Sequence, residues 1–160
     1  YFLDTESKDG EIVDAETDDQ ILNNEIDMIL RTTNRVTKLV RVDRKLEVDV
    51  TSTNSVVVWS FNTLAYDIGF SIMHNNREIL TYQRYNSHEK TIRGSFEAAS
   101  AEKITFLWDN SYSRWRTKTV RYAVKLLSKA EYEQAVSSIH ELKAQSLVHR
   151  KSRDHMKATL

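Results

Sequence analysis

Apolar and polar residues divide the chain into three parts. Between residues 19 and 34, apolar side chains recur at steps of three and four, which predicts an amphipathic helix that Asp18 or Asp19 is suited to cap. Residues 36–127 instead contain about eight short segments with strand character, each bounded by turn residues. From Ser128 the helical period returns. The pattern predicts a mainly β fold: an antiparallel β-sandwich with one helix on each side.

The clearest predicted strand is the continuous apolar run Val56–Phe61, which contains Trp59. Such a run is typical of a strand that is buried on both faces. Gly69 lies inside another apolar segment and predicts a bulge or a close approach to a neighbouring group. The other predicted strands cover residues 36–42, 46–51, 66–73, 78–85, 91–96, 104–108 and 117–127.

The last predicted strand, 117–127, follows a loop that begins with turn-forming residues at 109–111. Its residues alternate in character, which is the period of a strand and not of a helix. The set expected on the core-facing side is Val120, Tyr122, Val124 and Leu126, and the set expected off that side is Lys118, Arg121 and Lys125.

The two ends of the chain differ in character. Residues 1–18 are acidic with few large apolar side chains, so they are expected to form a disordered leader. At the other end, Ser128 and Glu131 have the spacing of a capping box for a helix. Its apolar stripe fades past Leu142, and residues 145–157 are expected to form a basic tail, as a fraying helix or a linker.

Composition narrows the classes of function. The chain has 23 basic and 23 acidic residues, so its net charge does not favour nucleic acid as a partner. The first 30 residues hold ten acids and one lysine, and the rest therefore carries an excess of nine positive charges. There is no cysteine, which favours the cytosol, and no apolar run approaches the roughly 18 residues of a membrane span. No glycine-rich phosphate loop or metal-ligand spacing is present, so no cofactor and no metal are expected.

Five motifs between residues 46 and 127 resemble, in order, the GOLD (Golgi dynamics) domain family. They are Trp59-Ser60-Phe61, the segment 66–72 with Tyr66, Asp67 and Gly69, the segment 84–88 with Asn86 and His88, Gly94, and the segment 108–113 with Asp109, Asn110 and Tyr112. The resemblance is to the cytosolic branch, found in Sec14-like lipid-transfer proteins, the Golgi acyl-CoA-binding adaptor and the FYVE and coiled-coil autophagy adaptor. It implies a jelly-roll-like sandwich that makes protein and membrane contacts in vesicle traffic or lipid transfer, without catalysis. The motif residues themselves are expected to be mainly structural.

The best functional candidate is the loop 113–118. Trp115 follows a turn, and Arg114, Arg116 and Lys118 flank it. An indole among cations suits the headgroup region of an anionic membrane, and the same residue types dominate protein hot spots. The alternative is that Trp115 folds back into the core and leaves the cations solvated.

Two further basic residues, Arg84 and Arg93, fall on predicted strands. If they lie near Arg116, they extend one basic face that suits phosphoinositide; otherwise they are ordinary charges that protect strand edges.

Catalysis has little support in the sequence. Ser87 and His88 are neighbours in an extended segment, so they point to opposite sides and do not form a nucleophile and base pair. A hydrogen-bonding role at a turn is the simpler expectation for Asn86 and His88. Asp67 and Asp109 could hold a cation, but local hydrogen bonding is again simpler.

The sequence therefore predicts a non-catalytic module that recruits a larger protein to trafficking partners or to an anionic membrane surface, peripherally on Golgi or endosomal membranes. The alternative is an accessory GOLD domain of a Sec14-like intracellular lipid-transfer protein.

Overall fold

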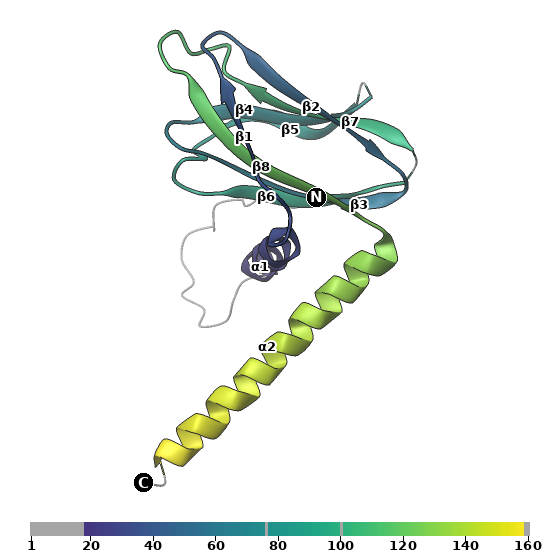
Figure 1. Cartoon of the computed structure of the whole chain (residues 1–160), viewed down its shortest axis with the longest axis vertical. Coiled ribbons are helices and arrows are strands. Elements are labelled where there is room, and N and C mark those ends of the chain that lie inside the picture. The colour runs from purple at the N-terminus through teal and green to yellow at the C-terminus, as the bar shows by residue number, and fades with distance from the viewer. Residues whose placement is uncertain (1–17, 76, 100, 159–160) are drawn as a thin grey trace.

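The computed structural model describes residues 18–158 apart from 76 and 100, so the predicted acidic leader lies almost wholly outside the described residues. Eight strands form two four-stranded antiparallel sheets that pack face to face (Figure 1). One sheet has the order β1-β8-β3-β6 and the other β2-β7-β4-β5. The strands are β1 (Val36–Val40), β2 (Lys45–Ser52), β3 (Ser55–Thr63), β4 (Ile68–His74), β5 (Arg77–Tyr85), β6 (Ile92–Ala98), β7 (Glu102–Asp109) and β8 (Lys118–Leu127).

The strand order is that of a jelly roll: β4 and β5 form a hairpin within one sheet, and the other connections between successive strands pass from one sheet to the other. The predicted mainly β sandwich is therefore confirmed. The strand limits differ from those predicted by a few residues: the first strand ends at Val40, the fourth begins at Ile68, and β7 begins at Glu102.

The main core lies between the two sheets and is rich in aromatic side chains. Phe61 of β3 packs 4.4 Å from Phe70 of β4, measured between ring centroids, and Trp108 of β7 stacks 4.9 Å from Tyr122 of β8. The Trp59 ring also contacts Phe70, with 5.2 Å between the ring centroids. Aromatic rings at these separations stabilise the packing of the two sheets through their large buried apolar area and through favourable interactions between the rings. This core holds the ends of the strands, and thus the loops between them, in fixed positions.

Strand β3 is buried on both faces, as its continuous apolar run predicts. Val57, Trp59 and Phe61 face the other sheet, whereas Val56 and Val58 face the helices. The same holds for β8, where Ala123 and Leu127 join the helix-facing cluster. Leu126, the second-last residue of β8 and one of the set predicted to face inward, is 37% exposed.

Helix α1 (Asp18–Leu30) lies against the outer face of the β3-containing sheet (Figure 1). It ends at Leu30, four residues before the predicted end, and a turn follows in which Thr33 N–H donates to the Leu30 carbonyl. Ile26, Ile29 and Leu30 are buried against the sheet. Glu25 is also buried, and its carboxylate hydrogen-bonds to His140 of the second helix.

Helix α2 (Lys129–Ala158) begins where β8 ends and runs away from the sandwich (Figure 1). The Ser128 hydroxyl accepts a hydrogen bond from the Glu131 N–H at 3.1 Å, as a capping residue does. The first half of α2 packs through Tyr132, Ala135 and Ile139 against the apolar cluster between the helices and the sheet. The helix then continues through the predicted polar tail.

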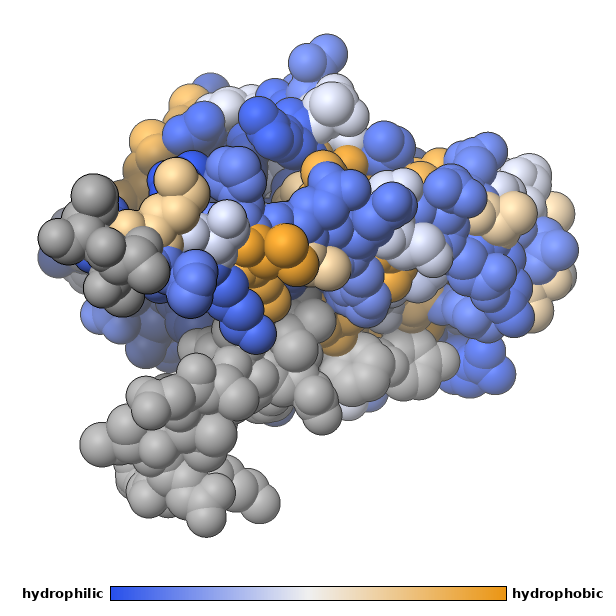
Figure 2. All heavy atoms as spheres, turned by 90° about the horizontal axis from the view of Figure 1, so that it is seen from below, coloured by the Kyte–Doolittle hydropathy of each residue, from blue (hydrophilic) through white to orange (hydrophobic). Residues whose placement is uncertain are grey.

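The face of the molecule that carries the helices, seen from below in Figure 1, is mostly polar. Seen from below, hydrophilic residues cover most of the visible face, and apolar residues show only in small groups between them (Figure 2). Within the described part of the chain, no helix is long and apolar enough to cross a membrane.

Gly69 is a point of close approach, as its position in the apolar segment predicts. A Cβ at this position would lie within 2.6 Å of the ring carbons of Tyr82, far inside van der Waals contact. The Tyr82 ring therefore covers the backbone of β4 just after Asp67. Gly69 also pairs with Arg84 of β5, so this contact supports the strand ends that carry the site described below.

We expect Gly69→Ala to lower the free energy of unfolding by about 1–3 kcal/mol, because the methyl group must displace the Tyr82 ring into solvent. Urea unfolding of Gly69→Ala, Tyr82→Ala and the double variant measures the coupling. If the steric contact is the cause, the second substitution costs less in the presence of the first. Additive effects of the two substitutions would contradict it.

Candidate functional site

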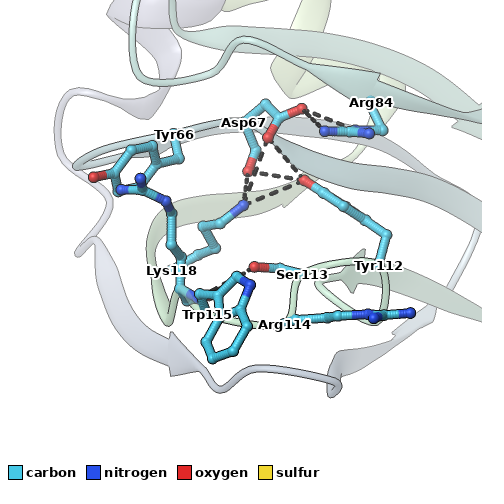
Figure 3. A pocket seen from close by; sticks show the side chains of 9 residues that line it. Tyr66, Asp67, Arg84, Tyr112, Ser113, Arg114, Trp115 and Lys118 are labelled. Atoms are coloured by element: carbon cyan, nitrogen blue, oxygen red, sulfur yellow. Dashed lines mark hydrogen bonds and ion pairs between the residues drawn. The ribbon is translucent and has the colours of Figure 1, made fainter.

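A hollow of about 420 Å³ lies at one end of the sandwich, where the β3–β4 connection meets the β7–β8 loop (Figure 3). Its lining comes from the two connections, from β5 and from the start of β8. The lining residues are Tyr66, Asp67, Arg84, Tyr112, Ser113, Arg114, Trp115, Arg116 and Lys118. Four of them are cationic and one is acidic. Residues far apart in the sequence thus form a single basic and aromatic site.

Asn110 anchors the β7–β8 loop. It is fully buried, and its side-chain amide donates to the carbonyls of Val40, Arg41 and Arg116 at 3.1, 3.2 and 2.8 Å. Asp109 accepts a hydrogen bond from the Ser111 N–H at 2.7 Å, which is the Asx turn that the sequence predicts. The loop residues between these bonds are therefore held in place at both ends.

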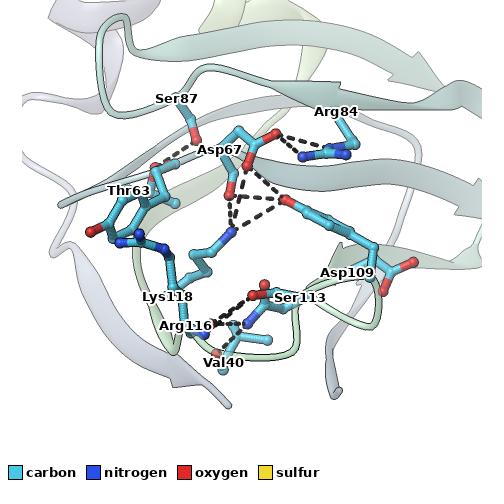
Figure 4. A network of polar contacts seen from close by, with 12 residues as sticks. Val40, Thr63, Asp67, Arg84, Ser87, Asp109, Ser113, Arg116 and Lys118 are labelled. Atoms are coloured by element: carbon cyan, nitrogen blue, oxygen red, sulfur yellow. Dashed lines mark hydrogen bonds and ion pairs between the residues drawn. The ribbon is translucent and has the colours of Figure 1, made fainter. Parts of the chain in front are cut away.

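Asp67 is the centre of the polar network (Figure 4). One carboxylate oxygen accepts from Arg84 Nε at 2.8 Å, and the other accepts from the Tyr112 hydroxyl at 2.9 Å. The Lys118 ammonium donates to the Asp67 carbonyl at 2.6 Å and lies 3.6 Å from its carboxylate. Burial opposes the ionised form of Asp67, but the hydrogen bonds from Tyr112 and Arg84 outweigh it, and its pKa is lowered.

The sequence analysis predicts that Lys118 points away from the core. This prediction is wrong, because Lys118 is only 2% exposed. It precedes Val120 and Tyr122 by even steps and therefore shares their inward face. Burial lowers the pKa of its ammonium against the opposing attraction of Asp67. Burial and the bond to Asp67 likewise raise the pKa of Tyr112. Lys118 is thus a structural part of the hollow and not one of its surface charges.

Two guanidinium groups lie over tyrosine rings at this site. Arg116 lies 4.0 Å from the ring centroid of Tyr66, and Arg84 lies 3.8 Å from that of Tyr112. Such stacking holds an arginine by its flat face and leaves donors along the edge of its plane.

Tyr66 itself has a strained backbone. Its φ is 67°, a value that bulky residues rarely adopt. The strain is held locally, since the Thr63 hydroxyl donates to the Tyr66 carbonyl at 2.6 Å. Strain of this kind is characteristic of functional sites, where the surrounding structure maintains it.

Trp115 is 89% exposed, the highest exposure among the large apolar side chains of the described residues. Figure 3 shows its indole at the rim of the hollow, away from the Asp67 network. The alternative that Trp115 folds back into the core is therefore wrong. The neighbouring Arg114 and Arg116 are also exposed, and neither has a carboxylate partner among the residues that the structure describes.

Leu39 and Leu64 are two further exposed apolar residues near the start of β8, and sequence reasoning missed them. They are 66% and 64% exposed. Both flank Thr119 of β8: Leu39 pairs with it across β1, and the Leu64 N–H donates to its carbonyl. Leu39 has outward parity relative to the buried Val40, which is a signal that could have identified it.

The remaining predicted site residues lie elsewhere. Arg93 of β6 forms an ion pair with Asp27 of α1 at 2.8 Å and does not line the hollow. The basic face that the sequence suggested therefore includes Arg84 and Arg116 but not Arg93. Trp59 is part of the core.

The turn at 86–90 is held by hydrogen bonds of Ser87 and Asn86. The Ser87 and Thr63 hydroxyls are hydrogen-bonded at 2.7 Å, and Ser87 is buried. The Asn86 carbonyl accepts from the N–H groups of residues 89 and 90, whereas His88 is exposed and lies 3.6 Å from Glu89. The arrangement accounts for these residues as turn structure. In the described ranges, no three His, Cys, Asp or Glu side chains gather as metal ligands.

The fold and this hollow define the class of protein: an eight-stranded jelly-roll sandwich with a basic, aromatic site at one end. No protein-family model matches the chain. Among solved structures, it is similar to the pre-peptidase C-terminal domain of collagenase from Bacillus anthracis, with 13% sequence identity and a TM-score of 0.43, over 58% of this chain and 89% of that chain. A similarity of this size carries no functional argument.

We expect Asp67→Asn to lower the free energy of unfolding by about 1–3 kcal/mol at neutral pH, because Lys118 and Arg84 lose a charged acceptor. The pKa of Asp67 is lower in the folded chain than its ordinary value of 3.8. Its contribution is therefore complete above that pH and is lost as the pH falls through the folded-state pKa. Urea unfolding at neutral and acidic pH should show the two proteins converging in acid. Asp154→Asn, on the exposed part of α2, is the control; a loss that is equal at both pH values would contradict this account.

Proposed function

We propose that this chain is a cytosolic GOLD-type domain that, without catalysis, recruits the protein that contains it to an anionic membrane surface in vesicle traffic, peripherally on Golgi or endosomal membranes. Two observations support the family assignment. The five sequence motifs occur in order, and the residues of the 66–72 and 108–113 motifs meet in the Asp67 network. The strand order is also the jelly roll that the resemblance implies.

The exposed Trp115 between two arginines carries the proposal. A tryptophan 89% exposed to water leaves most of an indole unburied, whereas the headgroup region of a membrane accommodates both its apolar ring and its N–H. Each cation near an anionic surface contributes about 1 kcal/mol, and Arg114 and Arg116 stand on either side of the indole. Leu39 and Leu64, which flank Thr119 near the start of β8, are further exposed apolar residues.

The loop is also rigid enough to present this anchor. Asn110 fixes it to β1, and Tyr112 and Lys118 fix it to Asp67. A preorganised loop loses little conformational freedom on binding, which favours association. A trafficking protein as partner would use the same residues, since tryptophan and arginine dominate hot spots, and the experiment below separates the two cases.

We expect the chain to sediment with vesicles that contain phosphatidylserine or phosphoinositide and not with neutral vesicles, more strongly at low than at physiological ionic strength. Trp115→Ala should weaken this binding by about tenfold or more, because transfer of an aromatic side chain from water is worth roughly 1.5–3 kcal/mol.

The matched control is Leu142→Ala, which truncates an exposed apolar side chain of α2, 56% exposed and outside the site. It should bind vesicles like the unaltered chain. Equal binding by Trp115→Ala would show that the loop is not the anchor. A folded chain that binds no vesicle would overturn the membrane proposal and leave a protein partner as the ligand of the loop.

A further inference from the structure

The hollow beside Trp115 has an excess of positive charge that its own structure does not neutralise. Arg84 and Lys118 both contact Asp67, whose single negative charge compensates only one of them. Arg114 and Arg116 have no carboxylate partner in the described part of the chain. The lining therefore carries a net charge of +3, from four cations and one carboxylate. A site with this charge attracts an anion.

The geometry favours a planar, multidentate contact. The Arg116 guanidinium is held flat on Tyr66 at 4.0 Å, so its orientation is set before any ligand arrives. Arg84 is held in the same way on Tyr112 and by Asp67. Fixed guanidinium groups bind phosphate oxygens through two parallel hydrogen bonds, which a flexible ammonium does not do.

The size and charge of the hollow select the class of anion. Its volume of about 420 Å³ is in the range of small-molecule sites, which hold about 300–1,000 Å³. A phosphate monoester carries a charge of about −1.5 to −2 near neutral pH, which fits the net charge of the lining better than the single charge of a carboxylate does. Tyr66, Tyr112 and Trp115 line the same space and offer apolar ring surface to the carbon skeleton of a sugar or inositol ring.

We propose that this hollow binds a phosphate monoester on a cyclitol or sugar ring, the group shared by phosphoinositide headgroups and soluble inositol phosphates, with Arg116 as its main contact and Arg114 and Arg84 beside it. The lipid source rests on the proposed function, because a headgroup in the hollow places Trp115 at the level of the surrounding headgroups. The soluble source does not depend on it.

The test is calorimetric titration of the full chain with soluble inositol trisphosphate, with uncharged inositol as the blank and inorganic phosphate as the minimal probe. We expect saturable binding of the trisphosphate. Arg116→Gln should weaken it about tenfold, the loss expected when a charge-assisted contact is removed. The matched control is Arg121→Gln, which removes one charge from an exposed position of β8 outside the hollow. It should change the affinity less than about twofold, as screened surface charges do.

A second pair of measurements separates this inference from the proposed function. Trp115→Ala should weaken vesicle binding by about tenfold or more and weaken the binding of soluble inositol trisphosphate much less, because the indole lines the hollow but inserts only into a membrane. Phosphoinositide vesicles should bind more strongly than phosphatidylserine vesicles of the same total charge if the ligand is a lipid, and equal binding would assign the hollow to a soluble phosphate.

Two results would overturn the inference. One is the absence of trisphosphate binding by the unaltered chain, even if vesicles bind, which would retain the membrane loop and remove the hollow as a site. The other is an equal loss in Arg116→Gln and Arg121→Gln, which would show that only overall charge matters. Trisphosphate binding without vesicle binding would support the hollow and overturn the membrane proposal.

Discussion

The burial of one ammonium group shapes the end of this sandwich. Lys118 begins β8 with its side chain turned inward, and a buried charge is costly unless it is paired and hydrogen-bonded. The groups that meet this demand come from separate parts of the chain: Asp67 from the β3–β4 connection and Tyr112 from the β7–β8 loop. Arg84 of β5 then completes the coordination of Asp67. The buried charge of Lys118 thus joins the β3–β4 connection to the β7–β8 loop. The neighbouring residues 114–116 face solvent.

Much of the fold follows from local pattern. The run Val56–Phe61 predicts a strand covered on both sides, and the structure places one sheet and two helices against it. Turn chemistry at Asp109 and Asn110 is also visible in the sequence, although the three carbonyls that Asn110 bonds are not. The boundaries are less predictable, because tertiary contacts decide where a strand or helix stops. Helix α1 ends at Leu30 since that residue is the last to pack on the sheet, whereas the residues beyond it turn toward β1.

The site itself was harder to predict, for two physical reasons. Lysine is so often solvated that its charge suggested an outward position for Lys118, yet the two-residue period that placed Val120 and Tyr122 inward applies equally to Lys118. The partner of Arg93 lies on a helix distant in sequence, and no local signal indicates that Asp27 reaches it. Ion pairs between elements decide which cations have a carboxylate partner. Among the cations that line the hollow, Arg114 and Arg116 have none within the described residues. The sequence left the facing of Trp115 open, and the structure shows it exposed between these two arginines in one loop.

Helix α2 leaves the sandwich at the end of β8, whereas the hollow lies at the beginning of that strand, so the two features sit at opposite ends of the same strand. Its 30 residues span on the order of 45 Å at about 1.5 Å per residue, and only the first half is packed. The second half of the helix therefore projects from the sandwich and moves with it. A tilt of the sandwich by about 10° sweeps the far end through roughly 8 Å, so a small reorientation at the Trp115 end becomes a large displacement at the other.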